Sequence, residues 1–221
     1  MKPTVSVIMP SYNATDTIER AILSVFAQTF SDWELIVVDD CSDDKSYEFV
    51  SQFEHPNLVI LRTKSNLGPA GARNVAIRRA KGKFIAILDA DDVMLSTRLE
   101  KQVKFLRANK DVFLVFSGSY VMDESGRTVA KMKALARGFE KTLRYFNPIV
   151  HASVMFRNDG TLYDQTFRLC EDYEFYVRAV SEGKKIASMK DFLVRYTEHE
   201  YSKQKKADFL RAGLRVKSRL M

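Results

Sequence analysis

Short apolar runs alternate with segments of helical spacing through the first half of the chain. Nearly every side chain in the runs is apolar, which is typical of buried strands, and they lie at 5–9, 35–38, 58–61 and 84–88. The segments between and after them predict helices at 17–26, 47–53, 70–80 and from 97 onward. Asp16 with Glu19, and Thr97 with Glu100, have the spacing of an N-terminal capping box. Strands and helices are therefore expected to follow one another in turn.

Apolar strands joined by helices favour a parallel sheet with helices packed on both faces. The connections are expected to be right-handed, and ligands are expected at the carboxyl ends of the strands. The sequence therefore predicts an α/β fold, Rossmann-like, with a mostly parallel sheet. The 221 residues, 46% of them hydrophobic, suffice for the core of one such domain.

The pattern loosens after a further apolar run at 112–116. Asp-Glu-Ser-Gly at 123–126 predicts a hairpin turn, whereas the basic stretch 127–147 shows no clear period, and no element is predicted there. The elements predicted beyond it are extended segments at 151–156 and 192–196, and a helix at 171–181 closed by Gly183.

Acidic residues cluster where two of the predicted strands end. The second strand is followed by Asp39 and Asp40, and the fourth by Asp89, Asp91 and Asp92. Carboxylates placed together repel one another, and a bound cation compensates them. Oxygen ligands suit Mg²⁺ or Mn²⁺, often held by one or two carboxylates together with substrate phosphates. One Asp-Asp pair alone is more often a turn or a helix cap, but two clusters at one sheet edge favour a nucleotide site with a metal.

The residues after the first strand argue against other nucleotide-binding classes. Pro10-Ser11-Tyr12-Asn13 lacks the glycines with which a dinucleotide-binding Rossmann fold approaches a pyrophosphate, and the chain has no P-loop lysine motif. A sugar nucleotidyltransferase would carry a glycine-rich basic loop at the same place. That class is therefore disfavoured, although it stays an alternative.

Composition narrows the class further. Charged residues make up 29% of the chain and are interspersed, as in folded soluble enzymes. No apolar run approaches the roughly 20 residues that span a bilayer, and no signal-peptide core precedes the first strand, so we expect a cytoplasmic protein. Two cysteines, Cys41 and Cys170, argue against a disulfide framework. The net charge of +7 indicates an acidic partner: nucleotide phosphates, a membrane surface or nucleic acid.

With these motifs the sequence resembles the family-2 glycosyltransferases, inverting enzymes with the GT-A fold. The resemblance extends from Val5 to about Ser202, and its pieces occur in the family's order. They are VSVIMPSYNA, VVDDCSDD, NLGPAGARNVAI, ILDADD, HASVMF and CEDYEFYVRA. A single Asp-x-Asp is a weak signal, whereas this whole series is a strong one. The resemblance implies transfer of a sugar from a nucleotide-sugar donor to a hydroxyl acceptor.

The resemblance also implies roles for matching residues on the donor side. The nucleotide pocket would be lined by Pro10, Ser11 and Tyr12. Asp40 would accept a hydrogen bond from the base, usually uracil, and Arg73 would lie near the nucleotide or its phosphates. The donor ribose and a divalent metal, Mn²⁺ or Mg²⁺, would be held by Asp89, Asp91, Asp92 and His199. Which carboxylate binds the metal directly is left open.

On the acceptor side, the resemblance implies that Asp172 is the general base. The reaction needs such a group, because a sugar hydroxyl must lose its proton as it attacks the anomeric carbon. His151 and Glu171 are placed on the same side. The structural alternative is that Glu171 and Asp172 only complement the dipole of their helix, and that His151 is a buried structural residue.

One residue departs from the family pattern. Where the family has glycine in an Asp-Asp-Gly-Ser turn, this chain has Cys41. A turn that needs a positive φ would leave Cys41 strained, because glycine adopts that conformation at little cost and other residues do not. Direct displacement needs no thiol nucleophile, so Cys41 and Cys170 are predicted to be small packed residues beside the site.

Residues 203–221 are predicted to form a basic helix with an apolar stripe of Ala207, Leu210 and Leu214. One interpretation is peripheral contact with the inner face of the membrane, close to a lipid-linked acceptor. The other is a solvated basic face whose stripe packs on the domain. Because the basic residues are not interleaved with aromatics, a nucleic-acid partner is disfavoured.

The resulting prediction is a GT-A domain over 1–202, with a donor half at 1–117 and an acceptor half at 118–202, followed by the basic helix 203–221. We predict an inverting, metal-dependent transferase that uses a UDP-sugar and acts in surface polysaccharide or glycolipid assembly. A nucleotide-binding protein of the same fold without transferase activity is the alternative.

Overall fold

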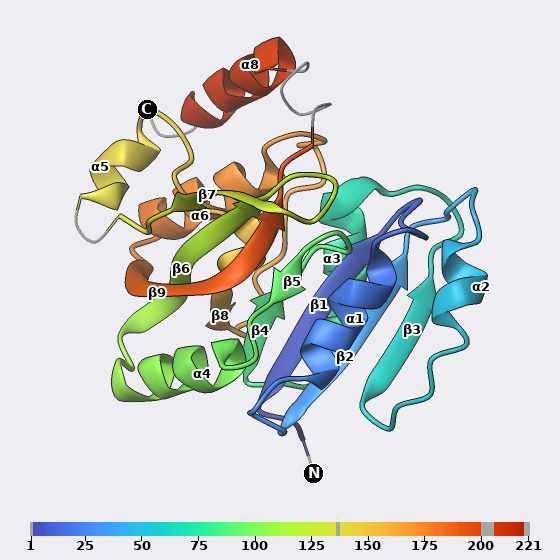
Figure 1. Ribbon diagram of the computed structural model, residues 1–221. Coiled ribbons are helices and arrows are strands. Elements are labelled where there is room, and N and C mark those ends of the chain that lie inside the picture. Colours follow the sequence, from blue (N-terminus) through green and yellow to red (C-terminus); the bar gives the residue numbers. More distant parts are fainter. Residues whose placement is uncertain (1, 136–137, 200–205, 219–221) are drawn as a thin grey trace.

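The computed structural model describes residues 2–135, 138–199 and 206–218, drawn in Figure 1. The strands are β1 (Val5–Ser11), β2 (Trp33–Asp39), β3 (Leu58–Arg62), β4 (Phe84–Ile87), β5 (Val93–Met94), β6 (Val112–Met122), β7 (Thr128–Met132), β8 (Met155–Arg157) and β9 (Lys185–Thr197). The helices are α1 (Ile18–Phe26), α2 (Ser46–Val50), α3 (Gly68–Arg79), α4 (Arg98–Ala108), α5 (Phe139–Leu143), the 3₁₀ turn η1 (His151–Ser153), α6 (Glu171–Ser181) and α8 (Lys206–Lys217).

The strands form one mixed sheet in the order β3-β2-β1-β4-β8-β6-β9-β5, with β7 paired to β6. β1 runs parallel to β2 and β4, and β2 runs parallel to β3, as the alternation of strands and helices predicts. β8 lies antiparallel between β4 and β6, so the second half of the sheet is mixed. The α/β fold is therefore confirmed, and its regular parallel part is the unit formed by the first four strands.

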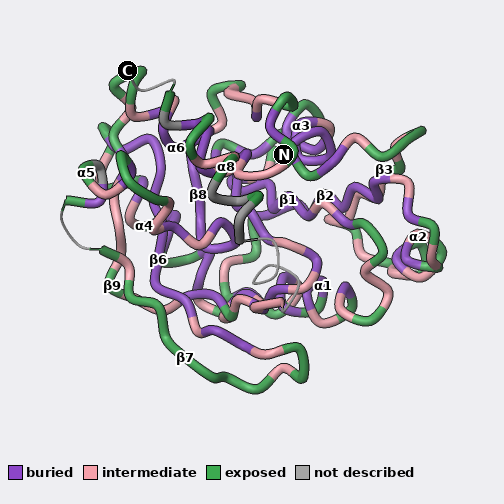
Figure 2. Tube along the Cα trace, turned by 90° about the horizontal axis from the view of Figure 1, so that it is seen from above, coloured by how far each residue is buried: buried purple, intermediate pink, exposed green. Residues whose placement is uncertain are grey.

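The central strands are buried on both faces because their side chains alternate between two cores. Val7 and Leu35 pack with α1 and α4 on one face, whereas Ile8 and Ile36 pack with α3 and α6 on the other. Figure 1 shows α1 in front of β1 and α3 behind it, and Figure 2 shows the buried centre and the exposed trace of β7. This arrangement fixes the carboxyl ends of β1, β2 and β4 at one edge of the sheet.

Both predicted capping boxes are wrong, although the helices themselves begin close to the predicted residues. The first turn of α1 is closed by backbone bonds to the Ala14 carbonyl, and no side-chain cap forms. Glu100 accepts a hydrogen bond from the Thr29 hydroxyl (2.9 Å) instead of closing the start of α4. The turn before α1 satisfies its first amides, and at the start of α4 the Leu99 amide donates to the Gln28 side chain (3.1 Å), a contact that local spacing does not reveal.

The second half contains elements that the pattern did not predict. The hairpin turn at 123–126 is confirmed, with Gly126 at φ 82°, but it leads into β7, where no element was expected. α5 also falls in the stretch 127–147, and the segment 151–156 begins as a 3₁₀ turn before β8. α6 coincides with its prediction and ends before Gly183, at φ 77°.

α8 packs on α6 through a residue outside the predicted stripe. Val216 is fully buried, whereas Leu214 is 63% exposed, so Leu214 does not pack on the domain as that interpretation required. The side chains of Ala207 and Leu210 lie outside the described residues. Within the described segments, no helix combines the length and apolar character needed to cross a bilayer.

Candidate active site

Two cavities meet at the carboxyl ends of β1, β2 and β4. The larger, of about 850 Å³, includes the predicted residues Pro10, Ser11, Tyr12, Asp40, Arg73, Asp89, Asp91, Asp92 and His199. The smaller, of about 310 Å³, includes Arg73, Asp89, His151, Glu171 and Asp172. Arg73, Asp89 and Tyr196 line both cavities. All of the predicted site residues therefore come together around one shared wall.

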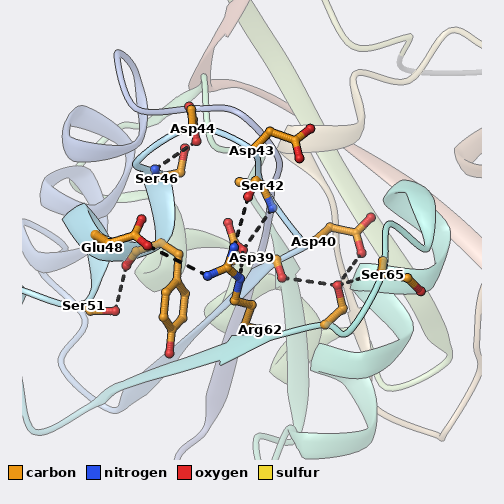
Figure 3. A network of polar contacts seen from close by, with 12 residues as sticks. Asp39, Asp40, Ser42, Asp43, Asp44, Ser46, Glu48, Ser51, Arg62 and Ser65 are labelled. Atoms are coloured by element: carbon orange, nitrogen blue, oxygen red, sulfur yellow. Dashed lines mark hydrogen bonds and ion pairs between the residues drawn. The ribbon is translucent and has the colours of Figure 1, made fainter.

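The end of β2 forms one side of the larger cavity, and Figure 3 shows the polar contacts around it. Asp40 is buried and accepts hydrogen bonds from the amides of Leu67 (2.9 Å) and Gly68 (2.8 Å) and from the hydroxyl of Thr63 (3.0 Å). Its carboxylate thus holds the start of α3, where the helix dipole favours a negative charge. Asp40 also faces the cavity, so it combines a structural role with a place in the pocket lining.

Cys41 has a φ of 61°, which is the left-handed conformation expected for the position where the family has glycine. Cys170, the residue before α6, has the same φ and was not expected to. The conformation is uncommon for residues other than glycine and stores strain beside functional sites. Burial, together with Asp172 and Glu171, raises the pKa of Cys170 to about 12, so its thiol stays protonated.

Arg73 joins the two cavities electrostatically. It extends from α3, is 5% exposed, and its guanidinium contacts Asp89 and Glu171, each at 2.7 Å. Burial alone would lower the pKa of Arg73, but Asp89 and Glu171 outweigh it and raise that pKa. Because both Asp89 and Glu171 already pair with its charge, Arg73 separates the two cavities and is poorly available as a phosphate ligand.

The acidic run after β4 divides into two half-buried carboxylates, Asp89 and Asp91, and one fully buried one, Asp92. Asp91 lies 2.5 Å from Nε2 of His199, and the hydrogen bond with Asp91 raises the pKa of that histidine. Asp92 is 1% exposed, and it accepts a hydrogen bond from the Thr197 amide (2.7 Å). Burial, with Asp91 and Asp89 nearby, raises the pKa of Asp92 well above its usual range. The second Asp92 oxygen is buried and has no hydrogen-bond partner among the described residues.

Asp172 lies in the first turn of α6 and lines the smaller cavity. Its Oδ2 accepts a hydrogen bond from the Asn147 amide at 2.7 Å. Burial, with Glu171 beside it, raises the pKa of Asp172 to about 7. A carboxylate with that pKa can accept a proton near neutral pH, as general bases do.

His151 lines the same cavity but both of its ring nitrogens are engaged. Nδ1 lies 2.5 Å from the Tyr176 hydroxyl, and the Tyr163 hydroxyl lies 3.1 Å from Nε2. Burial, with Arg73 and Arg98 nearby, lowers the pKa of His151 well below its usual range. The neutral ring therefore supports the floor of the cavity and offers no free nitrogen to an acceptor.

The model of the family named Glycosyl transferase family 2 matches residues 6–182. The chain belongs to glycosyl transferase family 2. An uncharacterised glycosyltransferase of Methanocaldococcus jannaschii is 34% identical over 205 residues, covering 88% of this chain and 71% of that protein. The UDP-Glc:α-D-GlcNAc-diphosphoundecaprenol β-1,3-glucosyltransferase WfgD of Escherichia coli is 41% identical over 130 residues, covering 59% of this chain and 51% of WfgD.

Solved structures confirm the GT-A fold of this family-2 glycosyltransferase chain. S. aureus TarS 1–349 in complex with UDP-GlcNAc superposes with a TM-score of 0.74 at 23% identity, covering 96% of this chain and 64% of TarS 1–349. The mannosyltransferase PcManGT from Pyrobaculum calidifontis, in complex with GDP-Man and Mn²⁺, gives 0.74 at 23%, covering 99% and 65%. The chain thus spans about half of WfgD and about two thirds of the two solved chains.

Two residues of this family-2 chain escaped the sequence prediction. Asn147 lies in the weakly patterned stretch before η1, and nothing local signals its bond to Asp172. Arg168 lines the larger cavity, and no hydrogen bond or ion pair engages it among the described residues. Its guanidinium lies across Gly68, where an added Cβ would come within 3.0 Å of Nη1. Arg168 stands two residues before the CEDYEFYVRA motif, and that closeness to Asp172 in sequence was the available signal.

Proposed function

We propose that this chain transfers a sugar from a UDP-sugar to a hydroxyl acceptor with inversion at the anomeric carbon. The observation that carries the proposal is the meeting of two cavities at Arg73 and Asp89, one large enough for a nucleotide-sugar and the other holding Asp172. Membership of family 2 and the named activity of WfgD support it. A role in surface polysaccharide or glycolipid assembly follows from the same relatives.

The donor would lie in the larger cavity with its base near Asp40 and its diphosphate toward Arg168. Pro10, Ser11 and Tyr12 line the base end at the close of β1. Arg73 and His199 already contact carboxylates, whereas Arg168 is exposed and unpaired among the described residues. A guanidinium forms strong charge-assisted hydrogen bonds to phosphate oxygens. Arg168 therefore suits the diphosphate best.

The residues present fit a divalent metal that the donor helps to hold. No three histidine, cysteine or carboxylate side chains converge as a complete metal cage among the described residues. Asp91 and His199 offer an oxygen and a nitrogen side by side, and Mg²⁺ or Mn²⁺ is often completed by substrate phosphates. We assign the metal to this pair, because Asp92 faces the backbone of β9 and Asp89 is paired with Arg73. Bound there, the ion would stabilise the negative charge of the departing diphosphate.

Asp172 would act as general base in the smaller cavity. The acceptor oxygen forms a bond to the anomeric carbon while the bond from that carbon to the diphosphate oxygen breaks, and the hydroxyl proton passes to Asp172. Attack from the side opposite the leaving group inverts the anomeric configuration. Arg73 keeps Glu171 paired beside Asp172, which limits repulsion between the two neighbouring carboxylates.

The donor assignment is tested by calorimetric titration of UDP, GDP and ADP with and without Mn²⁺. UDP is expected to bind best, and Mn²⁺ is expected to strengthen its binding at least about tenfold, or about 1.4 kcal/mol. Asp91→Asn is expected to remove the Mn²⁺ effect, and Arg168→Ala is expected to weaken UDP about tenfold while leaving uridine unchanged. Arg79→Ala, at the exposed far end of α3, is the matched control. Absence of nucleotide binding with Mn²⁺ present would sink the proposal.

We further propose peripheral contact with an anionic membrane through two sets of exposed side chains: Arg211, Leu214 and Arg215 on α8, and Tyr145 and Phe146 after α5. Tyr145 is 71% and Phe146 58% exposed, and α6 contacts both α5 and α8. Exposed aromatic and basic side chains are both typical of membrane-surface binding. The protein is expected to sediment with phosphatidylglycerol vesicles and not with phosphatidylcholine vesicles. Phe146→Asp should reduce the bound fraction, and failure to sediment with anionic vesicles would contradict the assignment.

A further inference from the structure

Both polar atoms of the Asn147 side chain form hydrogen bonds beside the proposed base. Nδ2 donates to Oδ2 of Asp172 at 2.7 Å, and Oδ1 accepts from the Ile149 amide at 3.0 Å. The second bond fixes the amide to the backbone of its own loop, whose next residues, Ile149 and Val150, line the smaller cavity. The orientation of the Asp172 carboxylate is thereby set by a neighbouring segment as well as by α6.

A base needs both a fixed direction and an ionised ground state. A hydrogen bond donated to one carboxylate oxygen favours the ionised form and leaves the second oxygen to take the proton. A carboxyl group at position 147 could donate this hydrogen bond only while protonated, and once ionised it would repel Asp172. An amide stays neutral and keeps its N–H donors at every pH, so it favours the ionised form of Asp172 throughout. The residue type at 147 therefore matches the task.

We propose that Asn147 is the positioning residue of the general base: it holds the Asp172 carboxylate in place from the acceptor-side loop and favours its ionised form. The inference rests on the proposed role of Asp172. The Tyr173 backbone amide also donates a hydrogen bond to this carboxylate. The charged and titratable groups that act on it are Glu171 and Cys170 beside it, Arg73 from α3, Asp89 after β4, and the hydroxyls of Tyr163 and Tyr176. None of these groups is altered when Asn147 is changed.

Two substitutions separate the electrostatic part of this role from loop geometry. Asn147→Asp keeps the shape and an acceptor for the Ile149 amide, but places a second carboxylate against Asp172. Asn147→Ala removes both bonds. Since a hydrogen bond to a charged group is lost in each, the pKa of Asp172 should rise by about one to two units in the alanine variant and further in the aspartate variant. The matched control is Asn109→Ala, which removes the hydrogen bond that the Asn109 side-chain amide donates to the Phe105 carbonyl at the end of α4.

The test is an NMR titration of the aspartate carboxyl carbons, with the Asp172 signal assigned by its loss in Asp172→Asn. The expected result is a raised Asp172 pKa in both Asn147 variants and an unchanged one in Asn109→Ala. An Asp172 pKa that stays at the wild-type value in Asn147→Asp would overturn the inference. This readout needs no substrate, so it holds whether or not the chain turns over a donor.

A second readout separates this inference from the proposed function. Release of UDP from UDP-glucose, with water as acceptor, is followed against pH. The rising limb is expected to move to higher pH in the Asn147 variants, while UDP affinity by calorimetry stays at the wild-type value. A limb that keeps its position in both variants counts against Asn147. Full UDP release by Asp172→Asn counts against the base itself, which is a failure of the proposed function.

Discussion

Replacing Asp172 by asparagine is expected to lower sugar transfer by about 10²–10⁴-fold while leaving UDP binding unchanged. The asparagine keeps the shape and can still accept the Asn147 hydrogen bond, but it cannot take the proton from the acceptor hydroxyl. The donor cavity does not include Asp172, so calorimetry with UDP should not distinguish the variant from the wild type. The measurement is donor turnover at saturating UDP-sugar, with UDP release as the readout.

The role of Asp172 also predicts how the rate of sugar transfer depends on pH. Asp172 acts as base only when ionised, and its pKa is raised to about 7, so transfer should rise as pH increases through 7 and level off above it. Asp111→Asn, at an exposed site that forms an ion pair with Lys185, makes the same chemical change away from the cavities and should leave the profile intact. A rising limb that survives in Asp172→Asn would show that another group takes the proton.

Replacing Arg73 by methionine is expected to destabilise the fold by about 3–5 kcal/mol, because removal of one member of a buried ion pair leaves its partners uncompensated. Here both Asp89 and Glu171 lose their partner at once. Methionine fills most of the volume, so the loss reports charge more than packing. The free energy of unfolding is measured by urea titration.

The matched control is Arg78→Met, which makes the same change at an exposed position of α3. Surface substitutions of this kind usually alter stability by less than about 0.5 kcal/mol. A stability loss in Arg73→Met no larger than that of the control would mean that the two carboxylates find other partners. Because Arg73 also separates the cavities, nucleotide affinity should be recorded in the same variant under conditions where it is folded.

The first half of the fold was predictable because each element carries its own signal. The apolar runs of β1 to β4 predict buried strands. The spacing of Ile18, Ile22 and Val25 predicts which face of α1 is buried. The acidic residues that end β2 and β4 were predicted to meet, and β1 does lie between those strands. Parallel strands determine such a meeting through their order alone.

The parts that escaped prediction depend on distant partners. Glu171 lies 98 residues from Arg73, and Asp172 lies 25 residues from Asn147, so no local period marks either contact. The predicted capping box of α4 failed for the same reason, because the Leu99 amide donates to the Gln28 side chain, 71 residues away. Most of the residues that line the two cavities could thus be named from the sequence, whereas Asn147, Arg168 and the pairing of the side chains could not.

The shared wall at Arg73 has a thermodynamic consequence. The Arg73 guanidinium pairs with Asp89, which lines both cavities, and with Glu171, which lines the smaller one. A ligand that changes the charge in one cavity therefore changes the field in the other. Linkage then requires symmetry: whatever factor a bound donor applies to the affinity for an acceptor, a bound acceptor applies to the affinity for the donor. The order in which the two substrates arrive affects the rates, but the stability of the ternary complex is the same by either path.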